Sequence, residues 1–288
     1  MAISEPRILV AGCGALGSKI AKGLATTARV YGLKRHPDRL PEGVLPLAAD
    51  LQMPEQLAQV VPDNLDAVIY CLTPNSYDDE GYRTAFVSGL ENLINTMKAQ
   101  GQELNRLLFV SSTGVYQQDD DNWIDESSPT APLRFGGKRL LEGEQCAAMA
   151  PWPSTTIRFS GIYGPGRTRF LESVINGELK PAAPSPYTNR VHEDDAAAAA
   201  VHLINRSLRG EPLETCYLAS DSEPVTLGDI VQWIQSQISC QPPTANARSG
   251  RRAGSKRISN QRLLESGFRF RYPSYREGYG EMIQSRLS

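Results

Sequence analysis

Three glycines near the N-terminal end have the spacing of a phosphate-binding loop. The segment RILVAGCGALGSKIAKGL places Gly12, Gly14 and Gly17 between an apolar run and a helical pattern, and Ala15 and Leu16 lie inside the motif. In a G-x-G-x-x-G turn, the first glycine permits the tight turn, the second lets a pyrophosphate approach the backbone, and the third allows close helix–strand packing. The helix N-terminus then stabilises the anion. The motif predicts a dinucleotide site; the alternatives are a glycine-rich packing turn or S-adenosylmethionine.

Two cations follow the second apolar run, in the segment YGLKRHP. NAD sites carry an acidic residue about 20 residues after the glycines, whereas Lys34 and Arg35 stand there in this chain. Because guanidinium binds phosphate bidentately, the pair favours NADP over NAD. The alternative is a pair of solvated surface charges. Further along, Asp50 is expected either beside the adenine or at the start of the next helix.

Alternating strands and helices must position these residues. Short apolar runs alternate with longer helical patterns, which predicts an α/β fold with a Rossmann-type, doubly wound parallel sheet. Ligands are then expected beyond the carboxyl ends of the strands. Thr226 has the residue type and position of a helix N-cap. The five runs taken as strands are residues 7–12, 28–33, 67–72, 106–112 and 154–159.

We expect a dinucleotide-binding core over residues 1–164, to which residues 190–221 return, and a smaller substrate-side lobe over residues 165–288. The acidic stretch 117–129 is expected to be free of strands, and the Pro/Gly/Ser-rich, basic stretch 241–257 is expected to be a loop. Ligands should lie between the core and the lobe.

Composition excludes several classes of protein. The formal net charge of −2 gives no electrostatic case for nucleic acid or an anionic membrane. No apolar run approaches the roughly 20 residues that span a bilayer, and the first strand begins too early to leave room for a signal peptide. The five cysteines are scattered without a CxxC pair, which argues against a zinc site or a disulfide framework and suits a reducing cytoplasm. We therefore expect a cytoplasmic protein whose partner is a small molecule.

Several further motifs occur in a fixed order: FVSSTGVY, DESSPTAP, KRLLE, RFSGIYGPGR and NRVHEDDAAAA. Together with the glycine loop they resemble the extended and atypical short-chain dehydrogenase/reductases, also called the NAD-dependent epimerase/dehydratase family. The resemblance covers nearly the whole chain. It implies an NAD(P)-dependent oxidoreductase or epimerase-like enzyme, and it admits a homodimer, because this family often pairs through helices that include the lysine helix.

The resemblance assigns roles residue by residue. Ser112 corresponds to the hydroxyl that polarises a substrate carbonyl, or else it satisfies backbone at a strand end. Lys138 corresponds to the lysine that grips the nicotinamide ribose, or else it pairs with Glu142 one helical turn later. Cys71 and Thr73 follow the strand along which the family's cofactor lies, and Ser160 falls where the nicotinamide edge is expected.

Softer assignments complete the comparison. Arg190 and His192 fall at the junction to the substrate lobe, where Arg190 could hold an anionic group and His192 is expected to be structural. Phe86 stands where the family has an active-site asparagine.

The family's catalytic tyrosine is replaced by Arg134, four residues before Lys138. Guanidinium stays protonated at physiological pH and cannot deliver a proton, but it can anchor an anion or stabilise negative charge. A relocated acid would have to be Tyr163 or Tyr116, each of which also has a structural explanation. The hypotheses are an NADP(H)-dependent oxidoreductase or epimerase-like enzyme acting on a small polar, anionic substrate, a non-catalytic NADP(H)-binding sensor or scaffold, and a Rossmann methyltransferase.

Overall fold

The computed structural model describes residues 5–249 and 254–288, and its contacts divide the chain into two compact units. The first comprises residues up to Val115, Ala131–Arg158 and Ala197–Tyr217; the second comprises Tyr116–Thr130, Phe159–Ala196 and Leu218–Ser288. From the sequence, we expect the core to extend to residue 164. In the structure, residues 116–130 and 159–164 group with the second unit.

The first unit is built on a seven-stranded sheet with the strand order β11-β7-β5-β4-β1-β2-β3. Strands β3, β2, β1, β4 and β5 pair in parallel, with registers such as Val10 opposite Gly32 and Ile69. The burial of nearly every residue of β1, β4 and β5 explains their continuous apolar runs. The predicted α/β class and Rossmann-type parallel sheet are thereby confirmed. The strands are β1 (Arg7–Ala11), β2 (Arg29–Lys34), β3 (Val44–Ala48), β4 (Ala67–Tyr70), β5 (Arg106–Ser112), β7 (Ser154–Phe159) and β11 (Cys216–Ala219).

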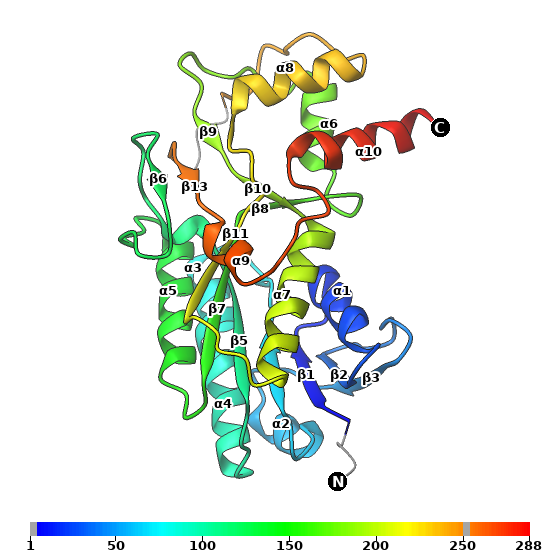
Figure 1. The fold of residues 1–288 in the computed structure, drawn as a ribbon, viewed down its shortest axis with the longest axis vertical. Coiled ribbons are helices and arrows are strands. Elements are labelled where there is room, and N and C mark those ends of the chain that lie inside the picture. Colours follow the sequence, from blue (N-terminus) through cyan, green and yellow to red (C-terminus); the bar gives the residue numbers. More distant parts are fainter. Residues whose placement is uncertain (1–4, 250–253) are drawn as a thin grey trace. The chain divides into compact units, whose positions relative to one another are not determined.

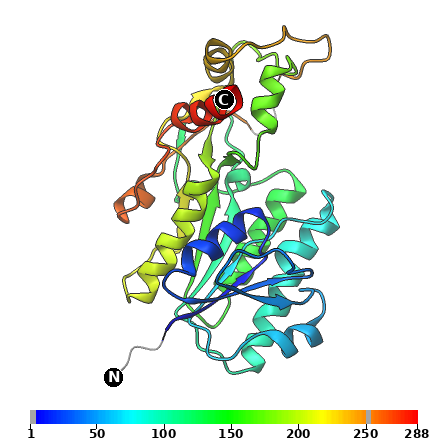
Figure 2. The same cartoon turned by 90° about the vertical axis from the view of Figure 1, so that its right-hand side faces the viewer.

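Helices cover both faces of this sheet. Figures 1 and 2 show α1 and α7 on one side, where Gly23 meets Val201, and α4 and α5 on the other. Among the described residues, no helix has both the length and the apolar character to cross a bilayer. The helical segments are α1 (Ala15–Leu24), α2 (Pro54–Val60), α3 (Asp79–Arg83), the π-helical turn η1 (Thr84–Ser88), α4 (Gly89–Ala99), the 3₁₀ turn η2 (Thr113–Val115), α5 (Phe135–Ala148) and α7 (Glu193–Leu208).

The second unit has its own apolar core, formed by side chains of α6, α8 and α10 with Tyr163 of β8. Thr226 caps α8 by accepting from the backbone N–H of Asp229, as predicted. The unit's elements are β6 (Trp123–Ile124), β8 (Gly161–Tyr163), α6 (Arg169–Ile175), β9 (Tyr187–Thr188), β10 (Arg190–His192), β12 (Val225–Thr226), α8 (Leu227–Gln237), β13 (Arg257–Ile258), α9 (Gln261–Glu265) and α10 (Tyr275–Leu287).

The expectation that residues 117–129 contain no strand is wrong. Trp123–Ile124 form β6 and pair in parallel with Arg257–Ile258, at the end of the segment expected to be a loop. A two-residue strand has no periodicity for the sequence to show, and its partner is distant along the chain. The Arg257 guanidinium also lies over the rings of Trp123 and Tyr187, which fixes this pairing further.

Candidate functional site

The glycine loop joins β1 to α1 with the geometry that a pyrophosphate requires. Gly12 has a φ of 96°, and a Cβ there would lie 2.2 Å from the carbonyl oxygen of Cys71. A Cβ at Gly17 would lie 2.1 Å from the Gly12 oxygen, whereas one at Gly14 would meet nothing within 4 Å. The first and third glycines are therefore required by packing, and the second leaves open space at the start of α1.

The N-terminus of α1 is suited to an anion. Its N-cap, Gly14, has no side chain to satisfy the first backbone N–H groups, and the first turn carries no acidic residue. Those N–H groups remain available for an external acceptor. Leu16 is buried and anchors the first turn of the helix, whereas Ala15 is exposed to solvent. The residues present thus fit the phosphates of a dinucleotide.

Lys34 ends β2 and Arg35 follows it, at the carboxyl edge of the sheet. Arg35 is exposed, and its Nη2 donates a 2.8 Å hydrogen bond to Oδ1 of Asn75, in the loop after β4. The bond orients the guanidinium, whereas a freely solvated arginine would sample many rotamers. Both cations stand at the end of β2, the strand that pairs with β1 and its glycine loop.

Asp50 has a local role in the backbone. Its Oδ1 accepts from the N–H of Gln52, and its own N–H donates to Oε1 of Gln56. The carboxylate shapes the turn before α2, whose N-cap is Met53. Asp50 therefore does not cap α2 itself. Its expected contact with the adenine remains a prediction.

The loop after β4 runs past the first glycine. Cys71 is buried and its carbonyl lies against Gly12, while Thr73 is exposed. The cofactor contacts expected of Cys71 and Thr73 remain predictions, and the approach of this loop to the glycine turn is consistent with them.

Two serines end β5 and have different surroundings. The buried Ser111 hydroxyl donates to Oε1 of Glu144 at 2.6 Å, and Glu144 also accepts from the Arg158 guanidinium at 2.9 and 2.5 Å. Arg158 is therefore part of a buried ion pair of the core. Ser112 is half-buried, and its Oγ accepts from the N–H of Gly114 at 3.1 Å. That bond leaves the Ser112 O–H proton to donate to another acceptor.

Lys138 lies on the first turn of α5 with its side chain exposed. Its expected alternative partner, Glu142, instead accepts from Nη1 of Arg139 at 3.1 and 2.8 Å. Arg139 also donates to both carboxylate oxygens of Asp79, on α3, at 2.8 Å each. The Lys138–Glu142 pair that the spacing allowed is thus replaced by an Arg139 network, and across the described ranges Lys138 forms no ion pair.

Arg134 is the N-cap of α5, with extended backbone and an exposed side chain. Its carbonyl accepts from the N–H of Lys138 at 3.2 Å, so the two cations stand one turn apart. Two carboxylates of the acidic stretch 117–129 have partners within the second unit: Asp125 accepts from Ser127 and Ser128, and Glu126 accepts from the N–H of Leu218.

The two tyrosines considered as relocated acids are buried in the second unit. The Tyr163 ring stacks on Tyr279 with centroids 4.3 Å apart, and its hydroxyl donates to the Ser274 carbonyl at 3.4 Å. Burial raises the pKa of Tyr163 well above its ordinary value. The Tyr116 hydroxyl donates to the Asp125 carbonyl at 3.0 Å. These surroundings favour a structural role for both.

His192 and Asp195 hold the second unit together. The imidazole is buried between Tyr163 and Tyr272, and its Nδ1 accepts from the N–H of Asp194. Burial lowers the pKa of His192, so it is neutral at physiological pH. Asp195 accepts from the N–H groups of Arg271 and Tyr272 at 2.9 and 2.8 Å. The structural interpretation of His192 fits this geometry.

Ser160 and Arg190 are more unusual. Both are buried, and within the described chain Ser160 Oγ and Arg190 Nη1 lack a hydrogen-bond partner. Ser160 donates its backbone N–H to the Ala219 carbonyl. A buried hydroxyl without a partner suits the ligand contact predicted for Ser160, which remains a prediction.

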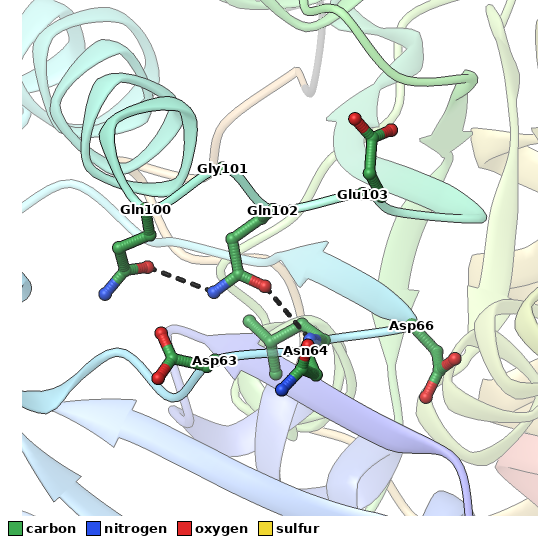
Figure 3. A pocket seen from close by; sticks show the side chains of 8 residues that line it. Asp63, Asn64, Asp66, Gln100, Gly101, Gln102 and Glu103 are labelled. Carbon is green, nitrogen blue, oxygen red and sulfur yellow. Dashed lines mark hydrogen bonds between the residues drawn. The ribbon is translucent and has the colours of Figure 1, made fainter.

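A cavity of about 520 Å³ opens at the opposite edge of the sheet, at the amino ends of β4 and β5. It is lined by residues 63–66 and 100–103, and Figure 3 shows that Gln100 and Gln102 bond to each other across it. Three of its eight lining residues are acidic and none is cationic, so it does not suit a dinucleotide. In the chain as described, no group of three or more His, Cys, Asp or Glu residues is placed to hold a metal ion.

Comparison with solved structures gives the family. A protein from Methylobacillus flagellatus, assigned by its description to the NAD-dependent epimerase/dehydratases, is 36% identical over 99% of this chain and 100% of its own, with a TM-score of 0.81. This chain belongs to the NAD-dependent epimerase/dehydratase family. A family model described as NAD(P)H-binding matches residues 12–134. This match argues against the methyltransferase alternative. No protein of curated function matches significantly by sequence.

More distant members of the epimerase/dehydratase family share the fold. The UDP-glucose 4-epimerase of Thermotoga maritima, solved with UDP-glucose, is 16% identical over 98% of this chain and all of its own, with a TM-score of 0.79. The UDP-glucose 4-epimerase of Thermus thermophilus, solved with NAD, is 19% identical over 96% of this chain and 98% of its own, with a TM-score of 0.76. At these identities the likeness concerns the fold alone.

Phe86 stands where the resemblance expects an active-site asparagine, a correspondence that remains a prediction. The residue lies inside the π-helical turn η1, buried against Tyr82, and its carbonyl would lie 2.5 Å from a Cβ at Gly143. π-helical turns are frequent at functional sites. The backbone irregularity is present here, but the side chain at its centre is apolar.

Sequence reasoning missed three side chains that contact a predicted residue or its neighbour: Asn75, Asp79 and Glu144. Each acts on a predicted residue or its neighbour across a large separation in sequence, as in the Asp79–Arg139 pair. Nothing local marks such partners. The position of Asn75 in the loop after β4 was the one available signal.

Proposed function

We propose that the protein binds NADP(H) and acts as an oxidoreductase or epimerase-like enzyme on a small polar substrate that carries an anionic group. The observation that carries the NADP(H) assignment is the pair Lys34 and Arg35 at the end of β2, with Arg35 oriented by Asn75. A 2′-phosphate supplies the negative charge that these cations require, and a bare ribose does not.

Two further residues of the first unit support the enzymatic interpretation. Lys138, free of the Glu142 pair, is available to the hydroxyls of the nicotinamide ribose. The Ser112 O–H can donate to a substrate oxygen at the end of β5. A bound nicotinamide supplies hydride transfer, while the chain's own groups bind and orient the reactants.

Arg134 determines the character of the substrate. One turn before Lys138, it gives α5 two exposed cations at its N-terminal end. Like charges at this spacing repel, and an anionic group near both would relieve the repulsion. This is the basis for a carboxylate or phosphate on the substrate, held by Arg134 rather than protonated by it.

A second candidate function is a non-catalytic NADP(H)-binding sensor or scaffold. The burial of Tyr163 and Tyr116, with both hydroxyls bound to backbone carbonyls, favours it. Neither tyrosine is then in a position to replace the missing acid. In the catalytic alternative the proton comes from water.

The two functions separate in one paired experiment. NADPH and NADH binding is measured on the purified protein, and carbonyl substrates are then screened for NADPH consumption by wild type and Arg134→Tyr. Turnover by wild type supports the enzyme. Tight NADPH binding without turnover, together with activity gained by Arg134→Tyr, supports the binding protein. Absence of binding to either nucleotide would eliminate both.

A further inference from the structure

The second unit contains a buried cation and a buried acid that do not pair with each other. Arg190 is 6% exposed and Asp221 is 1% exposed. Arg190 Nη1 and both carboxylate oxygens of Asp221 lack a hydrogen-bond partner among the described residues. Leaving a buried polar group without a hydrogen bond is unfavourable, and more so when the group is charged. Three such atoms on neighbouring residues indicate a missing partner.

The backbone holds these residues side by side. Asp221 donates its N–H to the Arg190 carbonyl at 2.7 Å, and Ser220 Oγ donates to the same carbonyl. Arg190 lies opposite Gly161 in the β8–β10 pair, next to Ser160, whose hydroxyl also lacks a partner in the part of the chain that the structure describes. The unsatisfied atoms therefore come from three adjacent segments of one unit.

The guanidinium of Arg190 is fixed in place. Its Nη2 donates to Oγ1 of Thr188, and its central carbon lies 5.6 and 5.8 Å from the ring centroids of Phe170 and Tyr275. These contacts hold the guanidinium in one orientation and leave Nη1 without a hydrogen-bond partner among the described residues. A guanidinium held in this way is preorganised for a planar or tetrahedral oxyanion.

The charge balance around the pair favours an anion. The carboxylates nearby are engaged elsewhere: Glu223 pairs with Arg276, and Glu277 caps α10 through Ser274. Burial raises the pKa of Asp221 to about 8, so the carboxyl is largely protonated at neutral pH. Arg190 lowers this pKa, and the N–H of Glu223 does so too without reaching hydrogen-bond geometry. The groups that face Asp221 electrostatically are Arg190, Glu223, Glu277, Tyr163 and Tyr279.

We propose that Arg190 and Asp221 together bind a small oxyanion, the charged group of a carboxylate or phosphate compound. Arg190 donates from Nη1, and the neutral Asp221 donates its O–H to the same anion. The anion site requires no cofactor, and it is proposed independently of the substrate contact assigned to Arg134. A protonated acid beside an arginine also selects against cations, which the buried guanidinium repels.

The probe is sulfate, which does not titrate near neutral pH, with acetate as the carboxylate counterpart. The full chain carries Lys34→Ser, Arg35→Ser, Arg134→Ser and Lys138→Ser, so that neither the proposed 2′-phosphate contacts nor the exposed cation pair of α5 can bind the probe. Isothermal titration at constant ionic strength should show saturable binding of one anion. Arg190→Met should weaken it at least tenfold, and the matched control Arg271→Met, whose side chain is 67% exposed, should stay within twofold. Stronger binding of sulfate indicates a phosphate compound, and stronger binding of acetate indicates a carboxylate.

A second measurement needs no loss of Arg190. Because the anion binds the protonated form of Asp221, binding at pH 8 should take up a fraction of a proton, seen as a dependence of the enthalpy on the buffer's ionisation heat. Asp221→Asn should bind with no uptake, and Arg190→Lys should bind several-fold more weakly. Absence of saturable binding, unchanged affinity in Arg190→Met, or no proton uptake would overturn the proposal in favour of a bridging water. NADPH binding, measured separately on unmodified protein, tests the proposed function independently.

Discussion

The guanidinium of Arg139 lies 2.8 Å from the carboxylate of Glu142, Nη1 to Oε2, one helical turn along α5. This pair removes the acid that Lys138 would otherwise meet at the same position. Two basic side chains adjacent in sequence are thereby divided between a structural network and a free ammonium group. Lys138 can therefore be substituted without breaking the Arg139–Glu142 pair.

Lys138→Met should reduce NADPH affinity roughly tenfold, equivalent to about 1.4 kcal/mol, because one charged hydrogen bond to the ribose is lost. Stability should change by less than about 0.5 kcal/mol, since the side chain is exposed. Fluorescence titration with NADPH measures the first quantity and urea unfolding the second. Glu142→Gln is the matched control and should leave NADPH affinity unchanged; an equal loss in both variants would contradict the assignment.

Replacing Lys34 and Arg35 together by Ser should abolish discrimination between NADPH and NADH. We expect NADPH affinity to fall by about 100-fold, because two charged contacts to one phosphate are lost at about 1.4 kcal/mol each, while NADH affinity stays the same. Arg39→Ser removes an exposed cation from the same loop and should affect neither. Parallel titrations with both nucleotides check this, and a parallel fall for NADH would show that the cations serve the fold instead.

Tyr163→Phe should leave any turnover of the wild-type protein unchanged. The hydroxyl is buried, its single bond to the Ser274 carbonyl is long at 3.4 Å, and the ring stacking on Tyr279 survives the change. We expect a loss of stability of at most about 1 kcal/mol. Steady-state rates and thermal unfolding of the two proteins provide the comparison. Abolished turnover with intact folding would establish Tyr163 as the relocated acid.

The buried pair between Arg158 and Glu144 should be strongly stabilising against the loss of either member. Glu144→Gln or Arg158→Met should cost about 3–5 kcal/mol, because each leaves a buried charge without its partner. The exposed pair Arg29–Glu5, at 3.5 Å, offers the contrast, and Glu5→Gln should cost less than about 1 kcal/mol. Urea unfolding followed by circular dichroism distinguishes the two, and similar small losses would refute the prediction.

Asp221 should make the protein less stable as the pH rises. The unfolded carboxyl loses its proton above its ordinary value near 4, whereas the folded one retains it until about pH 8. The folded state therefore binds more protons between these values, and stability falls with pH by up to about 1.4 kcal/mol per unit from this group. The free energy of unfolding of Asp221→Asn, measured with urea, should increase relative to that of wild type as the pH rises from 5 to 8. A constant difference across that range would mean that the folded carboxyl is ionised.

The sequence determined the architecture and the cofactor loop of this protein. Continuous apolar runs alternating with helical patterns require a buried parallel sheet, and three glycines at a strand–helix junction require a turn that other residues cannot make. Gly12, with its positive φ, and Gly17, pressed against the Gly12 carbonyl, show why that motif can be recognised without a structure. Local geometry and a fixed short spacing were sufficient there.

Only the tertiary structure decided which side chains are free to act. Lys138 was equally consistent with a surface pair until Arg139 was found to bind Glu142 and Asp79. The stacking of the Tyr163 ring on Tyr279 could not be read from the sequence either. Arg190 and Asp221 lie 31 residues apart in the chain, yet a backbone hydrogen bond makes them neighbours. Charge, burial and hydrogen bonding depend on partners distant along the chain, and these partners come together only when the chain folds.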